Sequence, residues 1–291
     1  MQGVGIDPKR FRDLAEQASA KGGSMIKVIV AGAGGRMGGR LISLIRESKS
    51  LQLAAAVEKK GHPAVGRDAG EVAGGSPLGI TVRDDLSALA DRGDVLIDFT
   101  APEATLANLD IMAMRNKAAV IGTTGLSPEQ ISELKTTAKK MACVFAPNMS
   151  VGVNLMLKVI ADMARRLGDD YDIEVMEAHH RLKKDAPSGT ALKIAEALAA
   201  ATGKDLKQAA VYGRKGVIGE RKRGEIGMQV IRAGDIIGDH TVLFGGIGER
   251  LEVTHRASSR DTFATGALRA AEWVVSQPQG LYDMQDVLGL R

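Results

Sequence analysis

The chain has a single cysteine, Cys143, and few aromatic residues: one Trp, three Tyr and five Phe. One cysteine excludes an intramolecular disulfide and a cysteine-based metal cluster, which fits a reducing compartment. So few rings leave little surface for stacking unpaired bases. No apolar run approaches the roughly 20 residues that span a bilayer, and residues 1–24 lack the order of a secretory signal. We therefore expect a soluble cytoplasmic protein with no membrane or nucleic-acid partner.

A large excess of charge is also missing, since 39 Lys and Arg nearly balance 35 Asp and Glu, for a formal net charge of +4. Basic clusters such as 220–223 are therefore more often solvated faces than anion sites. The length of 291 residues predicts two domains. Residues 1–24 stand apart, with a helical pattern at 11–18 and a Gly-Gly-Ser linker before Met25. We expect this segment to be a native extension or an addition from cloning, outside the fold.

The first half of the chain alternates short β-branched runs with helical patterns, which is typical of a parallel sheet wrapped by helices. Two helix starts follow strands, because Thr100-x-x-Glu103 and Ser127-Pro128-x-Gln130 both have the order of a capping box. We predict an α/β domain, a Rossmann-type doubly wound parallel sheet, over residues 25–149. Its five predicted strands are residues 26–32, 51–57, 94–100, 118–124 and 143–148.

The second half has a different character. An amphipathic helix pattern over 156–167 is followed by strands separated by Gly-rich turns at Gly234-Asp235 and Gly245 to Gly248, which suit hairpins. We predict a second, α+β domain over 150–259 on a mixed or antiparallel sheet. A helix over 262–275 is expected to return to the first domain, which would then include 260–291. The strands predicted here are residues 172–180, 226–233, 240–244 and 251–257.

A glycine-rich loop directly follows the first predicted strand and leads into a helix. Its glycines permit a tight turn and close approach of the backbone to a pyrophosphate, which would rest on the helix N-terminus. The spacing is G-x-x-G-x-x-G rather than the strict dinucleotide fingerprint, so a plain strand-to-helix turn is the alternative. The candidate cofactor residues here are Gly32, Ala33, Gly34, Gly35, Arg36 and Met37.

An acidic residue, Glu58, ends the second predicted strand twenty residues after Gly38, where a carboxylate would accept hydrogen bonds from ribose hydroxyls. The adjacent cation Lys59 favours a 2′-phosphate. The pair predicts that either NADH or NADPH binds. Two later loops at strand ends are candidates for the nicotinamide half, although position alone also fits simple turns. They are Gly122, Thr123 and Thr124, and Ala146, Pro147, Asn148 and Met149.

The densest chemistry lies in EVMEAHHRLKKDAPSGTA, residues 174–191. Strand alternation places Glu177 and His179 on one face. Ser188, Gly189 and Thr190 begin a helix whose N–H groups would bind a carboxylate, with His179, His180 and Lys183 around it. The alternatives are a polar strand end with satisfied histidines, or a metal site. Adjacent histidines point to opposite faces and a third ligand is missing, so we expect no metal.

On these residues the chain resembles the dihydrodipicolinate (4-hydroxy-tetrahydrodipicolinate) reductases of bacterial lysine and diaminopimelate synthesis. The resemblance rests on the run from Glu174 to Ala191, on Gly32 to Gly38, on Ile-Asp-Phe-Thr at 97–100 and on Gly-Thr-Thr-Gly at 122–125. It extends from Met25 nearly to Arg291. It implies a homotetramer, NADH or NADPH as hydride donor, and a cyclic dicarboxylate imine as substrate.

The resemblance also implies roles for single residues. His179 and Lys183 become the catalytic pair, and His180, Gly189 and Thr190 bind substrate. The glycine loop, Glu58 and the two later loops hold the cofactor. A related dehydrogenase of another small amino-dicarboxylate and a retired reductase that only senses nucleotide remain open. Retention of His179 and Lys183 argues against the sensor, which would need the glycine loop alone.

Overall fold

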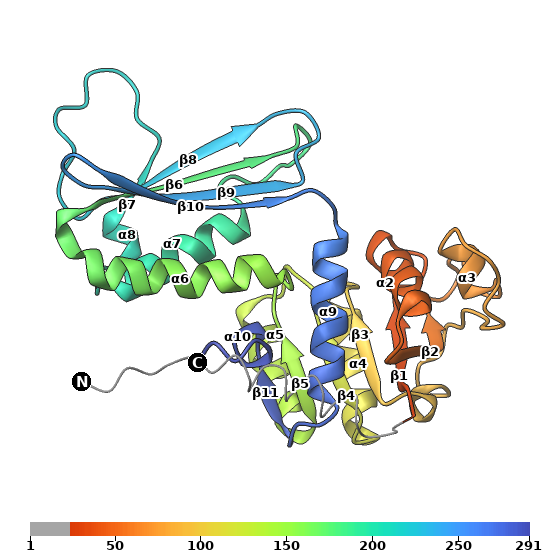
Figure 1. Ribbon diagram of the computed structural model, residues 1–291. Helices are drawn as coiled ribbons and strands as arrows, with labels where there is room; N and C mark the ends of the chain where they lie inside the picture. Colours follow the sequence, from red (N-terminus) through yellow and green to blue (C-terminus); the bar gives the residue numbers. More distant parts are fainter. Residues whose placement is uncertain (1–23) are drawn as a thin grey trace.

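The computed structural model describes residues 24–291, and the predicted helical turns at 11–18 lie outside them. Two β-sheets lie in two parts of the molecule (Figure 1). The first sheet has six parallel strands in the order β11-β5-β4-β3-β1-β2. Its strands are β1 (Ile26–Ala31), β2 (Leu51–Val57), β3 (Val95–Asp98), β4 (Ala118–Ile121), β5 (Ala142–Phe145) and β11 (Gly280–Tyr282).

Helices cover both faces of this sheet, as a doubly wound fold requires. Because alternate residues of β1 point to opposite faces, Val28 and Val30 pack with α2 (Arg36–Glu47) and α9 (Asp261–Val274). Ile29 packs on the other side with α4 (Pro102–Met114) and α5 (Pro128–Thr137). The predicted return of a late helix, α9, to the first sheet is confirmed. The remaining short helices of this part are α3 (Ala69–Val72), α10 (Met284–Val287) and 3-10 turns at Ala90–Arg92 and Ala138–Lys140.

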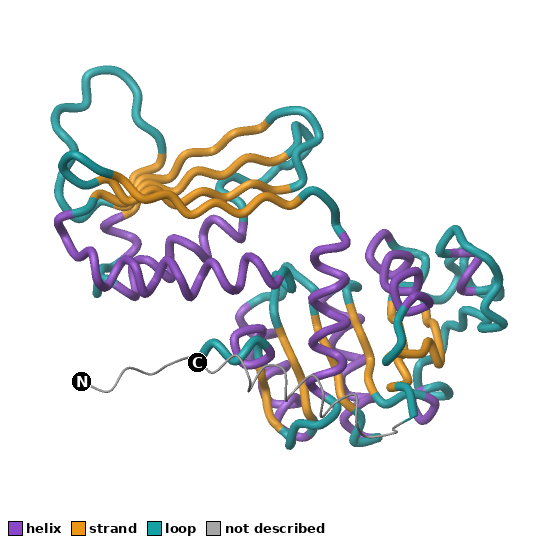
Figure 2. Tube along the Cα trace, in the orientation of Figure 1, coloured by secondary structure: helices purple, strands orange, loops and turns teal. Residues whose placement is uncertain are grey.

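The second sheet is mixed, with the order β10-β9-β6-β8-β7. Helices α6 (Val151–Leu167) and α7 (Gly189–Ala201) cover one of its faces, and its other face is left open (Figures 1 and 2). The core between them includes the fully buried Val175, Ile194 and Phe244. The strands are β6 (Asp172–His179), β7 (Ala210–Tyr212), β8 (Ile226–Arg232), β9 (Gly238–Gly245) and β10 (Arg250–Ala257), with α8 (Leu206–Ala209) and a 3-10 turn at Gly168–Asp170.

The turn signals were only partly correct. The hairpin at Gly245 to Gly248 is confirmed, because β9 and β10 pair antiparallel. The hairpin at Gly234-Asp235 is wrong, because β6 lies between β8 and β9, parallel to the first and antiparallel to the second. A Gly-Asp turn looks the same in sequence whether the next strand pairs with the last one or with another.

One predicted helix start is also wrong. Ala101 precedes α4, with Pro102 at the first helical position. The Thr100 hydroxyl instead donates to Asp98 at 2.6 Å, so a buried carboxylate takes the group that would have capped the helix. The other start is confirmed, since Ser127 and Gln130 form a complete capping box. In the described part of the chain, no helix has the length and apolar character to cross a membrane.

Candidate active site

The glycine loop connects β1 to the N-terminus of α2, and Arg36 and Met37 are the first residues of that helix. Gly32 has a φ of +72°, which disfavours other residues. A Cβ on Gly38 would lie 2.1 Å from the carbonyl oxygen of Gly32, so the loop can close only over a glycine. Among the described residues, no side chain caps α2 at Gly35. The N–H groups of its first turn can therefore donate hydrogen bonds to an anion, and the loop fits a dinucleotide pyrophosphate.

Glu58 lies beside this loop. Its carboxylate accepts hydrogen bonds from the backbone N–H of Gly34 at 3.0 Å and of Lys59 at 2.9 Å. Contact with the glycine loop puts the acid at the position where a ribose would follow a pyrophosphate bound there. Glu58 and the glycine loop are thus in contact, and the ribose role of Glu58 stays a prediction.

A buried carboxylate, Asp98, supports the loop after β4. It is 0% exposed and ends β3. Its Oδ1 lies 2.8 Å from the N–H of Thr100 and 3.3 Å from the Thr123 hydroxyl, and its Oδ2 accepts from Asn108 Nδ2 at 2.8 Å. Asp98 therefore sets the position of Thr123 in the candidate cofactor loop. The sequence motif at 97–100 contained this residue without revealing its partners.

The loop from Ala146 to Met149 leads from the first sheet to α6. Asn148 Nδ2 donates to the Thr190 hydroxyl oxygen at 3.0 Å, and Asn148 Oδ1 accepts from the N–H of Ser150 at 2.9 Å. One side chain of the candidate cofactor loops thus touches the candidate substrate helix. Residues 42 positions apart in sequence meet between the two sheets.

The candidate substrate residues lie at the start of α7. Ser188 is the N-cap residue, and its hydroxyl accepts from the N–H of Ala191 at 3.2 Å. Gly189 and Thr190 are the first two helical residues, so their N–H groups have no acceptor within the helix. No acidic side chain lies in the first turn of α7 to compete for them. This helix start suits a carboxylate.

His179 ends β6 and faces the same way as Glu177, as predicted. The Nδ1 of His179 lies 2.6 Å from Glu177 Oε2, and its side chain is 12% exposed. Glu177 is 2% exposed. The histidine is therefore held against a buried carboxylate at the edge of the helix start.

Lys183 lies in the connection between β6 and α7. Its N–H donates to the carbonyl of His180 at 3.1 Å, and its ammonium group lies 3.0 Å from Asp185 Oδ1. This hydrogen bond lowers the pKa of Asp185. The Nδ1 of His180 is buried and has no partner in the described part of the protein. A ligand that accepts or donates one hydrogen bond would satisfy it.

Two family models match the chain. The model described as dihydrodipicolinate reductase, N-terminus, matches residues 26–149, and that of its C-terminus matches residues 152–288. The chain belongs to the dihydrodipicolinate reductase family. The predicted family and reductase activity are confirmed by these matches and by the relatives below.

The 4-hydroxy-tetrahydrodipicolinate reductase of Syntrophus aciditrophicus is 55% identical over 267 residues, which cover 92% of this chain and 100% of the relative. The enzyme of the same name from Geobacter sp. is 53% identical over the same coverage. A dipicolinate-bound dihydrodipicolinate reductase from Paenisporosarcina has a TM-score of 0.72 at 25% identity, over 90% of this chain and 99% of that one. An amine dehydrogenase from Mycobacterium smegmatis shares the fold at 17% identity and a TM-score of 0.56, over 89% of this chain and 94% of that one.

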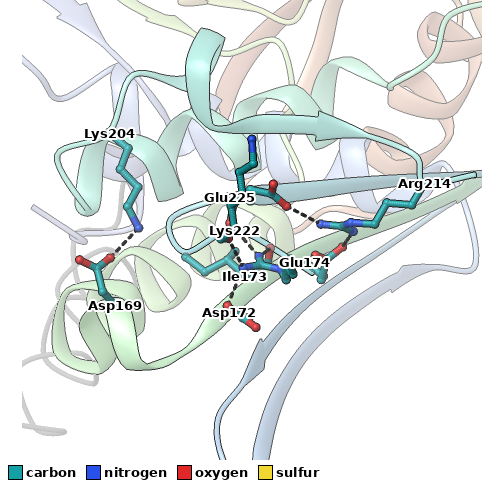
Figure 3. A network of polar contacts seen from close by, with 9 residues as sticks. Asp169, Asp172, Ile173, Glu174, Lys204, Arg214, Lys222 and Glu225 are labelled. Atoms are coloured by element: carbon teal, nitrogen blue, oxygen red, sulfur yellow. Dashed lines mark hydrogen bonds and ion pairs between the residues drawn. The ribbon is translucent and has the colours of Figure 1, made fainter. Parts of the chain in front are cut away.

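In this reductase, Glu174 lies at the other end of β6 from the candidate catalytic residue His179, although it opens the dense motif. Its carboxylate accepts from Arg214 at 2.9 Å and from Arg221 at 3.2 Å, and Arg214 also reaches Glu225 (Figure 3). A Cβ on Gly227, its partner in β8, would lie 1.9 Å from the Glu174 carboxylate. Glu174 therefore joins the segment after β7 to β6, which is a structural role.

Sequence reasoning missed two residues beside His179. Arg232, at the end of β8, donates from both terminal nitrogens to Glu177 at 2.8 Å. His240 in β9 lies 3.3 Å from the Ser188 hydroxyl, and its ring is 5.3 Å from that of His179. Burial, together with the nearby His179, lowers the pKa of His240 to about 4. Neither residue lies in a sequence motif. Their positions in the site follow from the pairing of β8 and β9 with β6, which the sequence does not reveal.

A metal centre finds no support in the described residues, where His, Cys, Asp and Glu side chains form no group of three that could hold an ion. Metal independence stays a prediction.

Proposed function

We propose that this reductase binds 4-hydroxy-tetrahydrodipicolinate at the start of α7, with His179 and Lys183 as its proton-transfer pair. The observation that carries the proposal is the contact of Asn148 with Thr190 at 3.0 Å, since it joins the dinucleotide loops to the helix start that His179 faces. His180, Ser188, Gly189 and Thr190 would hold the substrate carboxylates, which need N–H groups and cations.

The cofactor assignment uses the loops at the carboxyl ends of the parallel strands. The pyrophosphate of NADH or NADPH would rest on residues 32–37, and Glu58 would accept from the ribose hydroxyls. Lys59 would pair with a 2′-phosphate, so both cofactors are expected to serve. Residues 122–124 and 146–149 would hold the nicotinamide ribose half. When bound, the nicotinamide supplies the hydride.

The chain's own residues would handle protons. Lys183 would donate the proton that balances the hydride, and Asp185 would hold its ammonium group ready at 3.0 Å. His179 would act as acid or base, or stabilise charge that develops on the ring. Loss of the 4-hydroxyl as water must accompany the reduction.

The division of labour follows the two sheets. Residues 25–149 with 260–291 would bind the dinucleotide, and residues 150–259 would bind substrate and build a homotetramer. The open face of the second sheet supports the last point, because Ile231, which is 52% exposed, lies on this face together with the half-buried Met176 and Leu243. With one cysteine in the chain, the cytoplasm is the expected compartment.

The test follows loss of NADH or NADPH absorbance with freshly generated 4-hydroxy-tetrahydrodipicolinate, against aspartate semialdehyde and a control without substrate. We expect oxidation with the first substrate alone. Cofactor binding without oxidation by any substrate would favour a sensor, and oxidation with aspartate semialdehyde would favour a related dehydrogenase.

Lys183→Ala should reduce kcat by about 100-fold or more with little change in the dissociation constant of NADH. Lys193→Ala is a matched control, because this lysine of α7 is exposed and pairs only with Glu196 among the described residues. An unchanged kcat in Lys183→Ala would remove Lys183 from the mechanism.

A further inference from the structure

The Glu177 carboxylate connects three segments of the second sheet and its helix. Its Oε2 contacts His179 Nδ1 at 2.6 Å, and its Oε1 accepts from the backbone N–H of Ser188 at 3.0 Å. Arg232 binds both oxygens at 2.8 Å and also donates to the carbonyl of Asp185 at 2.6 Å. Among the described residues, each hydrogen-bond partner of this buried carboxylate is thus a donor or, in the case of the histidine, able to be one.

The charge of Glu177 decides which atom carries the proton of the shared hydrogen bond. Burial alone would raise the pKa of Glu177, but Arg232, His179 and the Ser188 N–H together hold that pKa below its ordinary value. An ionised carboxylate only accepts hydrogen bonds, so the proton lies on His179 Nδ1. In the neutral form of the ring, the other nitrogen, Nε2, then has a free lone pair.

The space beside Nε2 is kept open by a glycine. A Cβ on Gly238 would lie 3.1 Å from Nε2 of His179 and 3.6 Å from Cε1 of His240. The His240 ring stands edge-on to His179, and burial keeps it neutral because its pKa lies at about 4. Within the described part of the protein, Nε2 of His179 makes no hydrogen bond to another residue. It is the nitrogen of this pair of rings that a substrate can use.

We propose that Glu177, held by Arg232, is a positioning residue that fixes His179 with its proton on Nδ1 and Nε2 as the reacting nitrogen. The same carboxylate holds the N–H of Ser188, so one group sets both the histidine and the start of the substrate helix. Carboxylates that orient a histidine in this way are known from hydrolase triads. The inference rests on the proposed role of His179 in proton transfer.

Glu177→Gln tests the proposal sharply. An amide must turn its NH₂ toward one of the neighbours, and Arg232 and the Ser188 N–H cannot accept a hydrogen bond. Only His179 can, by moving its proton from Nδ1 to Nε2. We therefore expect the variant to reverse the tautomer of His179 and to lower kcat by about 100-fold, with the KM for NADH changed less than about twofold, because the cofactor loops are untouched.

The matched control is Glu174→Gln. It removes another Arg-bound carboxylate from β6, three residues away and outside the site. We expect it to lower the unfolding midpoint while kcat and the His179 tautomer stay as in the wild type. Equal losses of kcat in both variants would show a general effect on β6 and overturn the proposal.

The tautomer is read by ¹⁵N NMR on the histidine-labelled full chain, with His179→Gln to assign the signals. Wild-type protein with the proton on Nε2 would overturn the inference even if every variant failed to fold. Arg232→Lys is a second variant, which keeps the charge but loses the two-pronged contact, and we expect a loss of kcat of about tenfold. If His179→Gln keeps full turnover, the proposed role of His179 is wrong, whereas the tautomer result is unaffected. The two failures are thereby distinguished.

Discussion

Replacement of Asp98 by Asn should destabilise the first domain and loosen the cofactor loop. The carboxylate is 0% exposed and lies within hydrogen-bond distance of five donor atoms, from Thr100, Thr105, Thr123 and Asn108. In the variant, an NH₂ group replaces Oδ2 and meets the Asn108 amide donor to donor. The substitution keeps the shape of the side chain, so the effect isolates the replacement of a carboxylate oxygen by an NH₂ donor.

The magnitude follows from the contacts. A hydrogen bond to a charged group contributes about 1.5–3 kcal/mol, and a buried donor without a partner costs about 1–3 kcal/mol more. We expect a loss of about 3 kcal/mol, which corresponds to a fall in melting temperature of about 6–12 °C for a domain of this size. Because Thr123 loses its anchor, the affinity for NADH should fall as well.

Thermal melting by circular dichroism and NADH titration by fluorescence measure the two effects. The control is Asp85→Asn, since this exposed carboxylate accepts from Ser87 and the neighbouring backbone at the surface. The control should melt within about 2 °C of the wild type. If Asp98→Asn also melts within that range and binds NADH equally well, the buried network does not support the loop.

Three further predictions concern single side chains. Glu58→Ala should weaken NADH more than NADPH in titrations, and equal losses would contradict its ribose role. Cys143 is fully buried and its pKa is raised to about 12 by burial, so iodoacetamide should modify it only in denaturant; rapid labelling of folded protein would contradict this. The pKa of His240, about 4, lies below its ordinary value of 6.5. Between these two pH values the unfolded chain therefore binds a proton at His240 that the folded protein does not bind. The unfolding free energy should fall by about 3 kcal/mol between pH 6.5 and 4, and His240→Gln should flatten this dependence in urea titrations.

Local sequence was sufficient for much of the fold and part of the site. β-Branched runs locate β1 to β5 to within a few residues, because a buried parallel strand needs continuous apolar side chains. Glycine spacing located the first loop, since backbone crowding at Gly38 excludes a side chain. The start of α7 could be predicted because Ser188, in a Pro-Ser-Gly-Thr run, is a residue type that is favoured at the N-cap of a helix.

Other parts of the fold depend on contacts between residues that lie far apart in the sequence. The three-residue strand β11 has too few residues for any alternation to be read, and it pairs with β5, which lies far away in the sequence, with Gly280 opposite Ala142. The order of β6, β8 and β9 depends on which strand edges meet. Nothing in the turn at Gly234-Asp235 encodes that choice.

The contacts around His179 likewise depend in part on residues that lie far apart in the sequence. Alternation within one strand places Glu177 beside the histidine, because neighbouring positions two apart share a face. Arg232 is 55 residues from Glu177, and His240 is 52 residues from Ser188. Their contacts exist only because β8 and β9 pair with β6 in one register, and a shift by one residue would turn both side chains to the other face of the sheet. The sequence therefore carries the candidate catalytic residues and the helix start within eighteen residues, whereas sheet pairing places Arg232 and His240 beside them.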